Sequence, residues 1–345
     1  MKKILLYITI FAFLILAAGI FTLGYYSFSL NAVNINNDEQ RIFTISEGEV
    51  AKEISSSLKK ENLIQNDLVF LLKLYLDKKQ NEIQAGDYLL ASNMTTEQII
   101  EIITNGKSSA KKLTIIEGWT LKDVAEELNQ INKTTKKEFY DIVGIPAVNY
   151  SNKTDKPKNF TNEFSFLADK PNTISLEGYL YPDTYYLTSS DDASSVIKKA
   201  LKNFDKKLTQ DLRDQIKKQN KTIFEIVTIA SIIEKEVKGT NDRKMVSGVL
   251  QNRMRIGMAL QVDATTLYAQ ADGTKIDNKT NSPYNTYLNR GLPLGPICNP
   301  SIDSIIAAIY PTANNYFFYL SSKEDGKTIF SKTFEEHKRA IQQHL

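Results

Sequence analysis

The hydrophobic pattern of this chain begins with a long uncharged run. After Lys2 and Lys3, residues 4–30 contain no charged side chain, and the next acidic residues are Asp38 and Glu39. A run of this length can cross a hydrocarbon core of about 30 Å as a helix. It also exceeds the apolar segment of an ordinary cleaved signal peptide, which is the alternative interpretation. The pattern therefore favours an uncleaved membrane anchor.

The charges that flank this segment predict its orientation. Lys2 and Lys3 stand on the short flank, and positively charged residues stay on the cytoplasmic side of a membrane. We expect a cytoplasmic tip and a transmembrane helix over residues 1–30, in the cytoplasmic (inner) membrane. The rest of the chain is then extracytoplasmic (periplasmic), after a polar, Asn-rich tether over residues 31–41.

Two later segments share one pattern of apolar and polar positions. Residues 43–58 and residues 113–128 align at a constant offset, with a Glu-Gly pair in each copy, at Gly48 and Gly118. Each copy predicts a short alternating strand, a glycine turn and an amphipathic helix. The pattern is typical both of an internal duplication and of a common local solution, and spacing does not decide between them.

The residues between the two copies predict a small folded module. An apolar stretch, a short strand pattern and a capped amphipathic stretch follow one another there. The expected elements are a helix over residues 67–76, a strand over 85–90 and a helix over 95–104 with Thr95 as its N-cap. The fold class is therefore α+β, with a small module over residues 42–107 and a larger mixed domain over residues 108–345.

Three stretches of the larger domain lack a regular period. Residues 144–173 contain three prolines and predict a long surface excursion, whereas residues 282–287 and 291–300 predict ordered loops. Loops rich in Tyr, Asn and Thr are natural sugar-binding surfaces, because aromatic faces stack on pyranose rings and amides bond to hydroxyls. The alternative is a structural turn whose Tyr side chains cap the core.

A helix with one buried stripe is expected over residues 224–237. Glu234 lies at one border of the stripe and Glu236 at the opposite border, so this helix does not bring the two carboxylates to one site. A half-buried carboxyl is the setting in which desolvation raises a pKa and produces a general acid near neutral pH. The alternative is an ordinary surface glutamate paired with Lys235 or Lys238.

Composition removes several classes of chemistry. The chain has 43 Lys plus Arg against 40 Asp plus Glu among 345 residues, which gives no basic field for nucleic acid. Its two histidines, His337 and His344, lie at the C-terminus, and Cys298 is its single cysteine. Zinc motifs and a CxxC redox pair are therefore absent, and we expect no metal and no cofactor. Chemistry would rest on carboxylates, Tyr, Asn and Gln.

Several motifs in one order resemble a known family. They are EGYLYPDTY at 177–185, ASIIEKE at 230–236, VLQNRM at 249–254, GMALQVD at 257–263, YNTY at 284–287 and GLP at 291–293. In this order the chain resembles the YceG-like, MltG-type endolytic murein transglycosylases, over roughly residues 113–337. The membrane anchor and the small module, LysM-like in that family, also match.

The resemblance implies an activity and a set of site residues. Members cut peptidoglycan glycan strands between N-acetylmuramic acid and N-acetylglucosamine without water and leave 1,6-anhydro ends, which terminates strand elongation. Glu234 matches the position of their catalytic glutamate, and peptidoglycan synthases (penicillin-binding proteins) are the implied partners. Glu177 and Asp183 would brace the cleft. The residues expected to contact substrate are Gln261, Asp263, Tyr284, Asn285 and Tyr287.

Two positions depart from the family pattern. The family's Gly-x-His-x-Phe run has Thr328 at the His position, so Thr328 must replace that His or activity is lower. The family's Gly-Leu-Pro-Pro-Gly-Pro run has Leu294 at its fourth position, a mild change in loop stiffness. Two other functions stay open from the sequence: a non-catalytic glycan-binding scaffold of the cell-wall machinery, and a secreted glycosidase with a second essential carboxylate.

Overall fold

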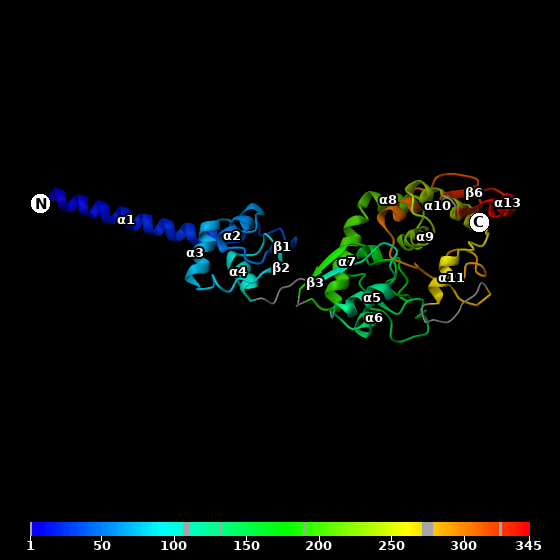
Figure 1. Ribbon diagram of the computed structural model, residues 1–345, viewed down its shortest axis with the longest axis horizontal. Coiled ribbons are helices and arrows are strands. Elements are labelled where there is room, and N and C mark those ends of the chain that lie inside the picture. Colours follow the sequence, from blue (N-terminus) through cyan, green and yellow to red (C-terminus); the bar gives the residue numbers. More distant parts are fainter. Residues whose placement is uncertain (1, 106–110, 132, 189–190, 271–278, 324–325) are drawn as a thin grey trace. The chain divides into compact units, whose positions relative to one another are not determined.

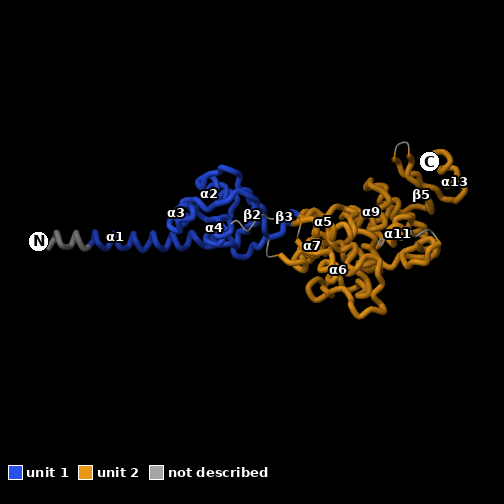
Figure 2. Tube along the Cα trace, turned by 60° about the horizontal axis from the view of Figure 1, so that its bottom comes forward, with its two compact units in different colours: residues 1–112, 186–190 blue, residues 113–185, 191–345 orange. Residues whose placement is uncertain are grey.

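The fold of this protein comes from a computed structural model of residues 1–345. It describes residues 2–105, 111–131, 133–188, 191–270, 279–323 and 326–345 (Figure 1). The chain divides into two compact units, residues 1–112 with 186–190 and residues 113–185 with 191–345 (Figure 2). Helices predominate in the described residues, beside three two-stranded sheets, so the predicted α+β class is confirmed.

The first unit consists of one long helix and a small module. Helix α1 (Lys2–Ser29) contains a 20-residue apolar segment, Ile10–Ser29, that is long enough to cross a membrane. The last residue of α1, Ser29, is only 2% exposed, so the helix ends in contact with the module. Its elements are β1 (Arg41–Ile45), α2 (Ala51–Lys60), α3 (Asp67–Leu76), β2 (Gly86–Leu90) and α4 (Thr96–Thr104).

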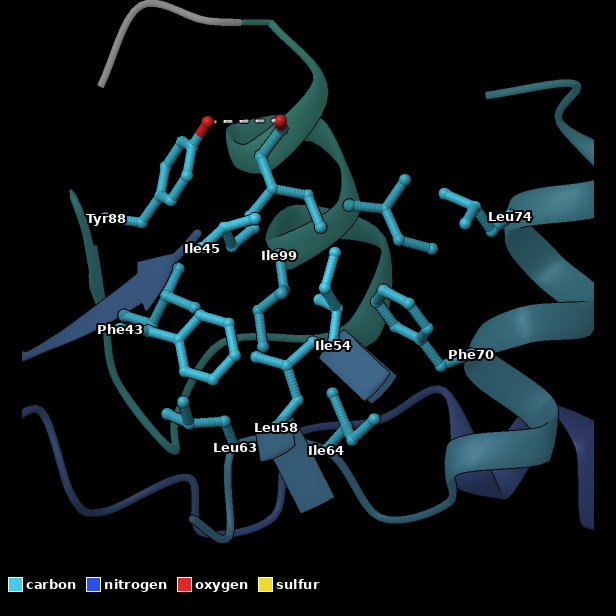
Figure 3. Close-up of a cluster of buried hydrophobic side chains, with 13 residues drawn as sticks. Phe43, Ile45, Ile54, Leu58, Leu63, Ile64, Phe70, Leu74, Tyr88 and Ile99 are labelled. Atoms are coloured by element: carbon cyan, nitrogen blue, oxygen red, sulfur yellow. Dashed lines mark hydrogen bonds between the residues drawn. The ribbon is translucent and has the colours of Figure 1, made fainter. Parts of the chain in front are cut away.

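The module is held together by one apolar core (Figure 3). β1 and β2 pair antiparallel with Phe43 opposite Tyr88, and both side chains are buried. The phenol of Tyr88 keeps a polar partner by donating to the carbonyl of Gln84 at 2.6 Å. Burial of aliphatic and aromatic side chains from all five elements is the main stabilising term of such a small unit.

Local capping explains where the helices of the module begin. Asn66 accepts hydrogen bonds from the backbone N–H groups of Leu68 and Val69 at the start of α3. Thr95 forms a capping box with Gln98 at the start of α4. The predictions of a helix over residues 67–76, a strand ending at residue 90 and an N-cap at Thr95 are therefore confirmed.

The second unit mixes many helices with short strands. The second copy of the strand–glycine–helix pattern is confirmed, with Gly118 between its strand and its helix. The elements of this unit are α5 (Leu121–Gln130), α6 (Lys136–Val143), a 3-10 turn (Ser165–Leu167), α7 (Ala193–Lys207), α8 (Gln210–Lys218), α9 (Ile223–Glu236), α10 (Thr240–Arg255), α11 (Asp263–Ala269), α12 (Ile302–Ile309), β5 (Phe318–Ser321), β6 (Thr328–Ser331) and α13 (Phe334–His344). The strands β3 (Lys111–Thr114) and β4 (Thr184–Leu187) each contain residues of both units.

The irregular stretch over residues 144–173 differs from the predicted surface excursion. It has little regular structure, as expected, but Phe160 and Phe166 are buried. Phe166 stacks on Phe204 of α7 with ring centroids 5.1 Å apart. The prediction that this stretch lies on the surface was wrong at these two residues. The many prolines and polar residues around them lower the average hydrophobicity of the stretch, although single aromatic side chains in it are buried.

Helix α9 lies at the centre of the second unit. It packs against α8, α10, α11 and α12. Every residue from 226 to 233 is buried, so the expectation of a single buried stripe was wrong. A stripe is the pattern of a helix with one neighbouring layer, whereas a helix enclosed on all sides is apolar all round.

Two neighbours in the sequence, Glu177 and Gly178, fix the surroundings of α9. Gly178 has φ +88°, and a Cβ there would lie 2.5 Å from Cβ of Pro296 and 2.9 Å from Val227. The buried Glu177 accepts from the backbone N–H of Leu121 at 3.0 and 3.1 Å, and from the hydroxyl of Tyr268 at 2.9 Å. The prediction that Glu177 braces the unit agrees with these contacts.

Burial raises the pKa of Glu177 to about 8, from an ordinary value near 4.5. Because the folded state favours the protonated carboxyl, its contribution to stability is complete below pH 4.5 and is lost as the pH rises toward 8. We expect Glu177→Gln, which does not titrate, to gain in melting temperature relative to the wild type by several degrees between pH 5 and pH 8. Fluorescence of Trp119, the single tryptophan, reports this melting.

The control is Glu163→Gln, which removes an exposed carboxylate. Its difference from the wild type in melting temperature is expected to stay nearly constant over the same pH range. A parallel pH profile for Glu177→Gln and the wild type would contradict the assignment of a protonated Glu177.

Candidate active site

Glu234 occupies the last turn of α9 and is nearly closed to water. Its side chain is 6% exposed, less than the half-burial that the sequence predicted, because α10 and α12 both cover this end of α9. It is the first ionisable residue after eight consecutive buried positions of the helix. A carboxylate in such a place needs polar partners to offset its desolvation.

Three donors meet the Glu234 carboxylate. Nη2 of Arg243 lies 3.1 Å from Oε1, and the backbone N–H of Ser301 donates to Oε2 at 2.9 Å. The hydroxyl of Ser301 donates to the same oxygen. Ser301 is the N-cap of α12, so the carboxylate also lies at the positive end of a helix dipole. This arrangement suits a charged carboxylate that is held in one orientation.

Arg243 lies between two acidic side chains. Besides Glu234 it approaches Asp303, with Nη1 3.5 Å from Oδ2. Its side chain is 10% exposed, and its Nε has no hydrogen-bond partner within the described part of the chain. The alternative pairing of Glu234 with Lys235 or Lys238 was wrong, since the ion pair forms with an arginine nine residues further along the chain.

A second carboxyl, Glu117, lies close to this centre. Partial burial raises its pKa, the negative charge of Glu234 raises it further, and the positive charge of Arg243 opposes both effects. The adjacent Gly118 has φ +79°, and a Cβ there would lie 3.7 Å from Cγ of Glu234. Asn299 holds this turn through backbone hydrogen bonds to Gly118 and Trp119 at 2.8 and 2.7 Å.

Sequence reasoning missed Glu117, Arg243, Ser301 and Asp303 as members of the site. In the sequence analysis, Glu117 was only part of the repeated Glu-Gly pattern. The Glu-Gly pair directly before a capped helix is the signal that could have drawn attention to Glu117. Nothing in the spacing of the other three residues points to Glu234.

Glu236 belongs to a different environment from Glu234, as predicted. It accepts a hydrogen bond from the hydroxyl of Tyr319 at 2.9 Å. Burial raises its pKa, and the charge of Asp263 adds to this effect. Asp263 itself accepts from the hydroxyl of Tyr287 at 2.5 Å, so two of the predicted substrate-binding residues lie together near Glu236.

Gln261 is exposed and has an unusual backbone conformation. Its φ is +51°, a left-handed value that side chains other than glycine seldom adopt. Thr286 holds this conformation, because its carbonyl accepts from the N–H of Gln261 and its hydroxyl from the N–H of Val262, both at 3.0 Å. Strained positions of this kind cluster at functional sites.

Tyr284 and Asn285 lie inside the protein. Their exposed fractions are 2% and 0%. The ring of Tyr284 lies 5.0 Å from that of Tyr268, and the amide of Asn285 donates to the carbonyl of Thr280 at 2.8 Å. Their contact with substrate stays a prediction. The interactions with Tyr268 and Thr280 stabilise the loop that contains Tyr284 and Asn285.

Two further predicted residues have defined partners. Asp183 accepts from the side-chain amide of Asn203 at 2.8 Å. Thr328, at the position of the family's His, donates from its hydroxyl to Asp242 at 2.7 Å. Asp242 directly precedes Arg243 on α10, which connects Thr328 to the site through one residue. Among the described residues, no group of three or more His, Cys, Asp and Glu side chains could hold a metal ion.

The fold and the site define an α+β protein with an apolar N-terminal helix and a carboxylate centre. The model of the YceG-like family matches residues 43–343, and the chain belongs to this family. A crystal structure of a YceG-like protein from Listeria monocytogenes is 32% identical and covers 87% of this chain and 99% of its own, with a TM-score of 0.56.

Two curated relatives are named endolytic murein transglycosylase. The Bacillus subtilis protein is 32% identical over 92% of this chain and 86% of its own length. The Streptococcus pneumoniae protein is 30% identical over the whole of this chain, which spans 65% of the length of that relative.

The buried ion pair generates a stability prediction. Removing one member of a buried pair costs about 3–5 kcal/mol, because the other charge is left uncompensated. We expect Arg243→Gln to lower the free energy of unfolding by about 3 kcal/mol. The double variant Glu234→Gln/Arg243→Gln should lose less than Arg243→Gln alone. Urea unfolding followed by Trp119 fluorescence measures all three variants.

Lys338→Gln serves as the control, because it breaks an exposed pair with Glu335 and should cost less than about 1 kcal/mol. An Arg243→Gln variant no less stable than this control would contradict the importance of the buried pair.

Proposed function

We propose that this chain is a membrane-anchored endolytic lytic transglycosylase of peptidoglycan. It cleaves linkages between N-acetylmuramic acid and N-acetylglucosamine in nascent glycan strands and leaves 1,6-anhydro ends, which terminates strand elongation. The observation that carries the proposal is Glu234, a buried carboxylate with three donors at the position of the family's catalytic glutamate. The names of the curated relatives support the same activity.

One carboxyl is sufficient for this reaction because it acts twice. Glu234 first gives a proton to the glycosidic oxygen while the bond from that oxygen to C1 of the muramyl residue breaks. It then accepts the proton of the muramyl 6-hydroxyl as that oxygen bonds to C1. No water is consumed, so the new end is lighter by one water than the end that hydrolysis produces. Ordinary glycoside hydrolysis, by contrast, uses two carboxylates.

Arg243 and Ser301 prepare Glu234 for its role as a base. Their hydrogen bonds hold the carboxylate in one orientation. In the acid step Glu234 has to carry a proton, and Asp303 then offers the guanidinium another partner. Glu117, whose own pKa is raised, is a neighbouring group that can hold a proton in the same centre.

Exposed polar groups of residues 261–263 and 284–287 contact the glycan. Gln261, Asp263 and Tyr287 are the residues proposed for direct contact, since they are open or partly open to solvent. Tyr284 and Asn285 hold the loop that carries Tyr287. Thr328 acts on the site through Asp242.

Location follows from the N-terminal helix. The apolar segment Ile10–Ser29 anchors the protein in the cytoplasmic membrane, with Lys2 and Lys3 on the cytoplasmic side. The second unit then meets nascent glycan strands outside the membrane, beside peptidoglycan synthases. The LysM-like module over residues 42–107 stands between anchor and catalytic domain in the sequence.

We expect Glu234→Gln to lower the rate by a factor of about 10² to 10⁴, because the amide neither gives nor takes a proton. The substrate is uncross-linked glycan strands, incubated with the full chain in detergent. Mass spectrometry of the products then quantifies the 1,6-anhydro ends.

The control is Glu225→Gln on the same helix, where glutamine also completes the capping box with Thr222. This variant should keep wild-type activity. Wild-type activity in Glu234→Gln would contradict the mechanism, and intact strands with the wild type would favour the glycan-binding scaffold.

Asp263→Asn separates a lyase from a two-carboxylate hydrolase. It removes the charge but keeps an acceptor for Tyr287, so we expect KM to rise about tenfold from a weakened charged hydrogen bond. The turnover should change far less, and all ends should remain 1,6-anhydro. Asp211→Asn, an exposed position on α8, is the control. Loss of turnover together with hydrated ends in the wild type would point to a hydrolase.

A further inference from the structure

Helix α3 of the module leaves an apolar stripe uncovered. Four large side chains at helical spacing form this stripe and are exposed by 71%, 47%, 69% and 59%: Leu68, Leu72, Tyr75 and Leu76. The opposite face of the helix, with Phe70 and Leu74, lies in the module's core (Figure 3). α3 is therefore apolar on both faces, although only one of them has a partner within the described residues.

An uncovered stripe of this kind has to be explained. Single exposed apolar side chains are common on soluble proteins, but three leucines and a tyrosine on one helix face mark an interaction surface. A helix that is apolar all round is found in protein cores or in contact with a membrane. The stripe offers aliphatic and aromatic surface and one phenol, a poor match for the many hydroxyls of a glycan.

Hydrogen bonds join the start of α3 to the end of the apolar helix α1. The side-chain amide of Asn66, the N-cap of α3, donates to the hydroxyl of Tyr25 at 2.9 Å. The amide of Gln65 donates to the carbonyls of Asn31 and Ala32 at 3.2 and 3.1 Å. The first residues of the predicted tether are thus held against the module.

The module therefore begins where the membrane ends. The uncharged run over residues 4–30 is longer than the roughly 20 helical residues that cross a hydrocarbon core of about 30 Å, and Ser29, at the end of α1, is already buried. Tyr25 lies in its last turns, where aromatic residues occupy the membrane–water interface. Both views place α3 on the side of the module that α1 enters and β2 farther away (Figures 1 and 2).

We propose that α3 lies in the membrane–water interface, with the stripe of Leu68, Leu72, Tyr75 and Leu76 inserted into the lipid. The proposal rests on the membrane anchor proposed above. A phospholipid surface is the occupant because hydrogen bonds hold the start of α3 against the end of α1, and the stripe is apolar like α1 itself. Lys78 and Lys79 follow Asp77, the C-cap of α3, and can meet anionic headgroups. The module then contacts the bilayer through both α1 and α3, instead of being connected to it by a tether alone.

The test places a fluorescent label at the stripe in the full chain. Leu72→Cys is labelled with an environment-sensitive dye and reconstituted into vesicles of phosphatidylcholine and phosphatidylglycerol without any other protein. Leu68→Cys gives a second reading of the same face. Cys298 is buried and should not react with the dye, so the wild type treated with the same dye serves as the blank. Quenching by doxyl-labelled lipid and by aqueous iodide is measured for each label.

Two control labels bracket the expected result. Leu16→Cys lies in the apolar segment of α1, and Glu47→Cys lies in the exposed turn after β1. We expect labels at Leu72 and Leu68 to be quenched by lipid with the doxyl group near the headgroup, to an extent comparable with Leu16. Their quenching by iodide should be several times weaker than at Glu47.

Three outcomes would overturn the proposal in different ways. Iodide quenching at Leu72 equal to that at Glu47, with Leu16 still in lipid, would mean that the stripe faces water and awaits a protein partner. Protection from iodide without quenching by lipid would mean that two copies of the chain pair through α3. Absence of lipid quenching at Leu16 would overturn the membrane anchor itself, and with it the basis of this proposal.

Discussion

The buried ion pair between Glu234 and Arg243 is the interaction on which the candidate site depends. The two side chains are 6% and 10% exposed, so each charge relies on the other to offset its lost hydration. Their meeting requires α10 to begin almost directly after α9 and to pack back against it. Ser301 completes the arrangement only because α12 starts at the same place. The site is therefore a product of helix packing around α9.

Such a pair constrains the proposed chemistry as well as the fold. Glu234 accepts hydrogen bonds from Arg243 and Ser301, whereas the first step of the proposed reaction needs a proton on the same carboxyl group. The remaining charges of the centre reduce this conflict. Asp303 places negative charge beside the same guanidinium, so the protonation of Glu234 leaves Arg243 with another partner. A single catalytic carboxyl thus requires several neighbouring charges, even where no second carboxylate attacks the substrate.

The sequence predicted those parts of the fold that local physics decides. The start of α4 at its Thr95 cap and the extent of α3 follow from side chains within a few residues of the element. The surroundings of α9 could not be predicted in this way, because periodicity reports one face and not the number of neighbours. The same limit applies to the site: Arg243 and Ser301 reach Glu234 from nine and 67 residues away, and no spacing rule connects them. Residue type alone also did not reveal that Asn285 is buried.

The two copies of the strand–glycine–helix pattern separate local structure from function. Gly48 and Gly118 have nearly the same conformation, with φ +82° and +79°, so the same local signal produced the same turn twice. A Cβ at Gly48 would meet nothing within 4 Å, whereas one at Gly118 would lie 3.7 Å from Cγ of Glu234. The glutamate before each glycine therefore has a different role: Glu47 is exposed on the module, and Glu117 has its pKa raised beside a second carboxylate. Whether the pattern arose by duplication or independently, only the tertiary contact with α9 places the second copy beside the candidate site.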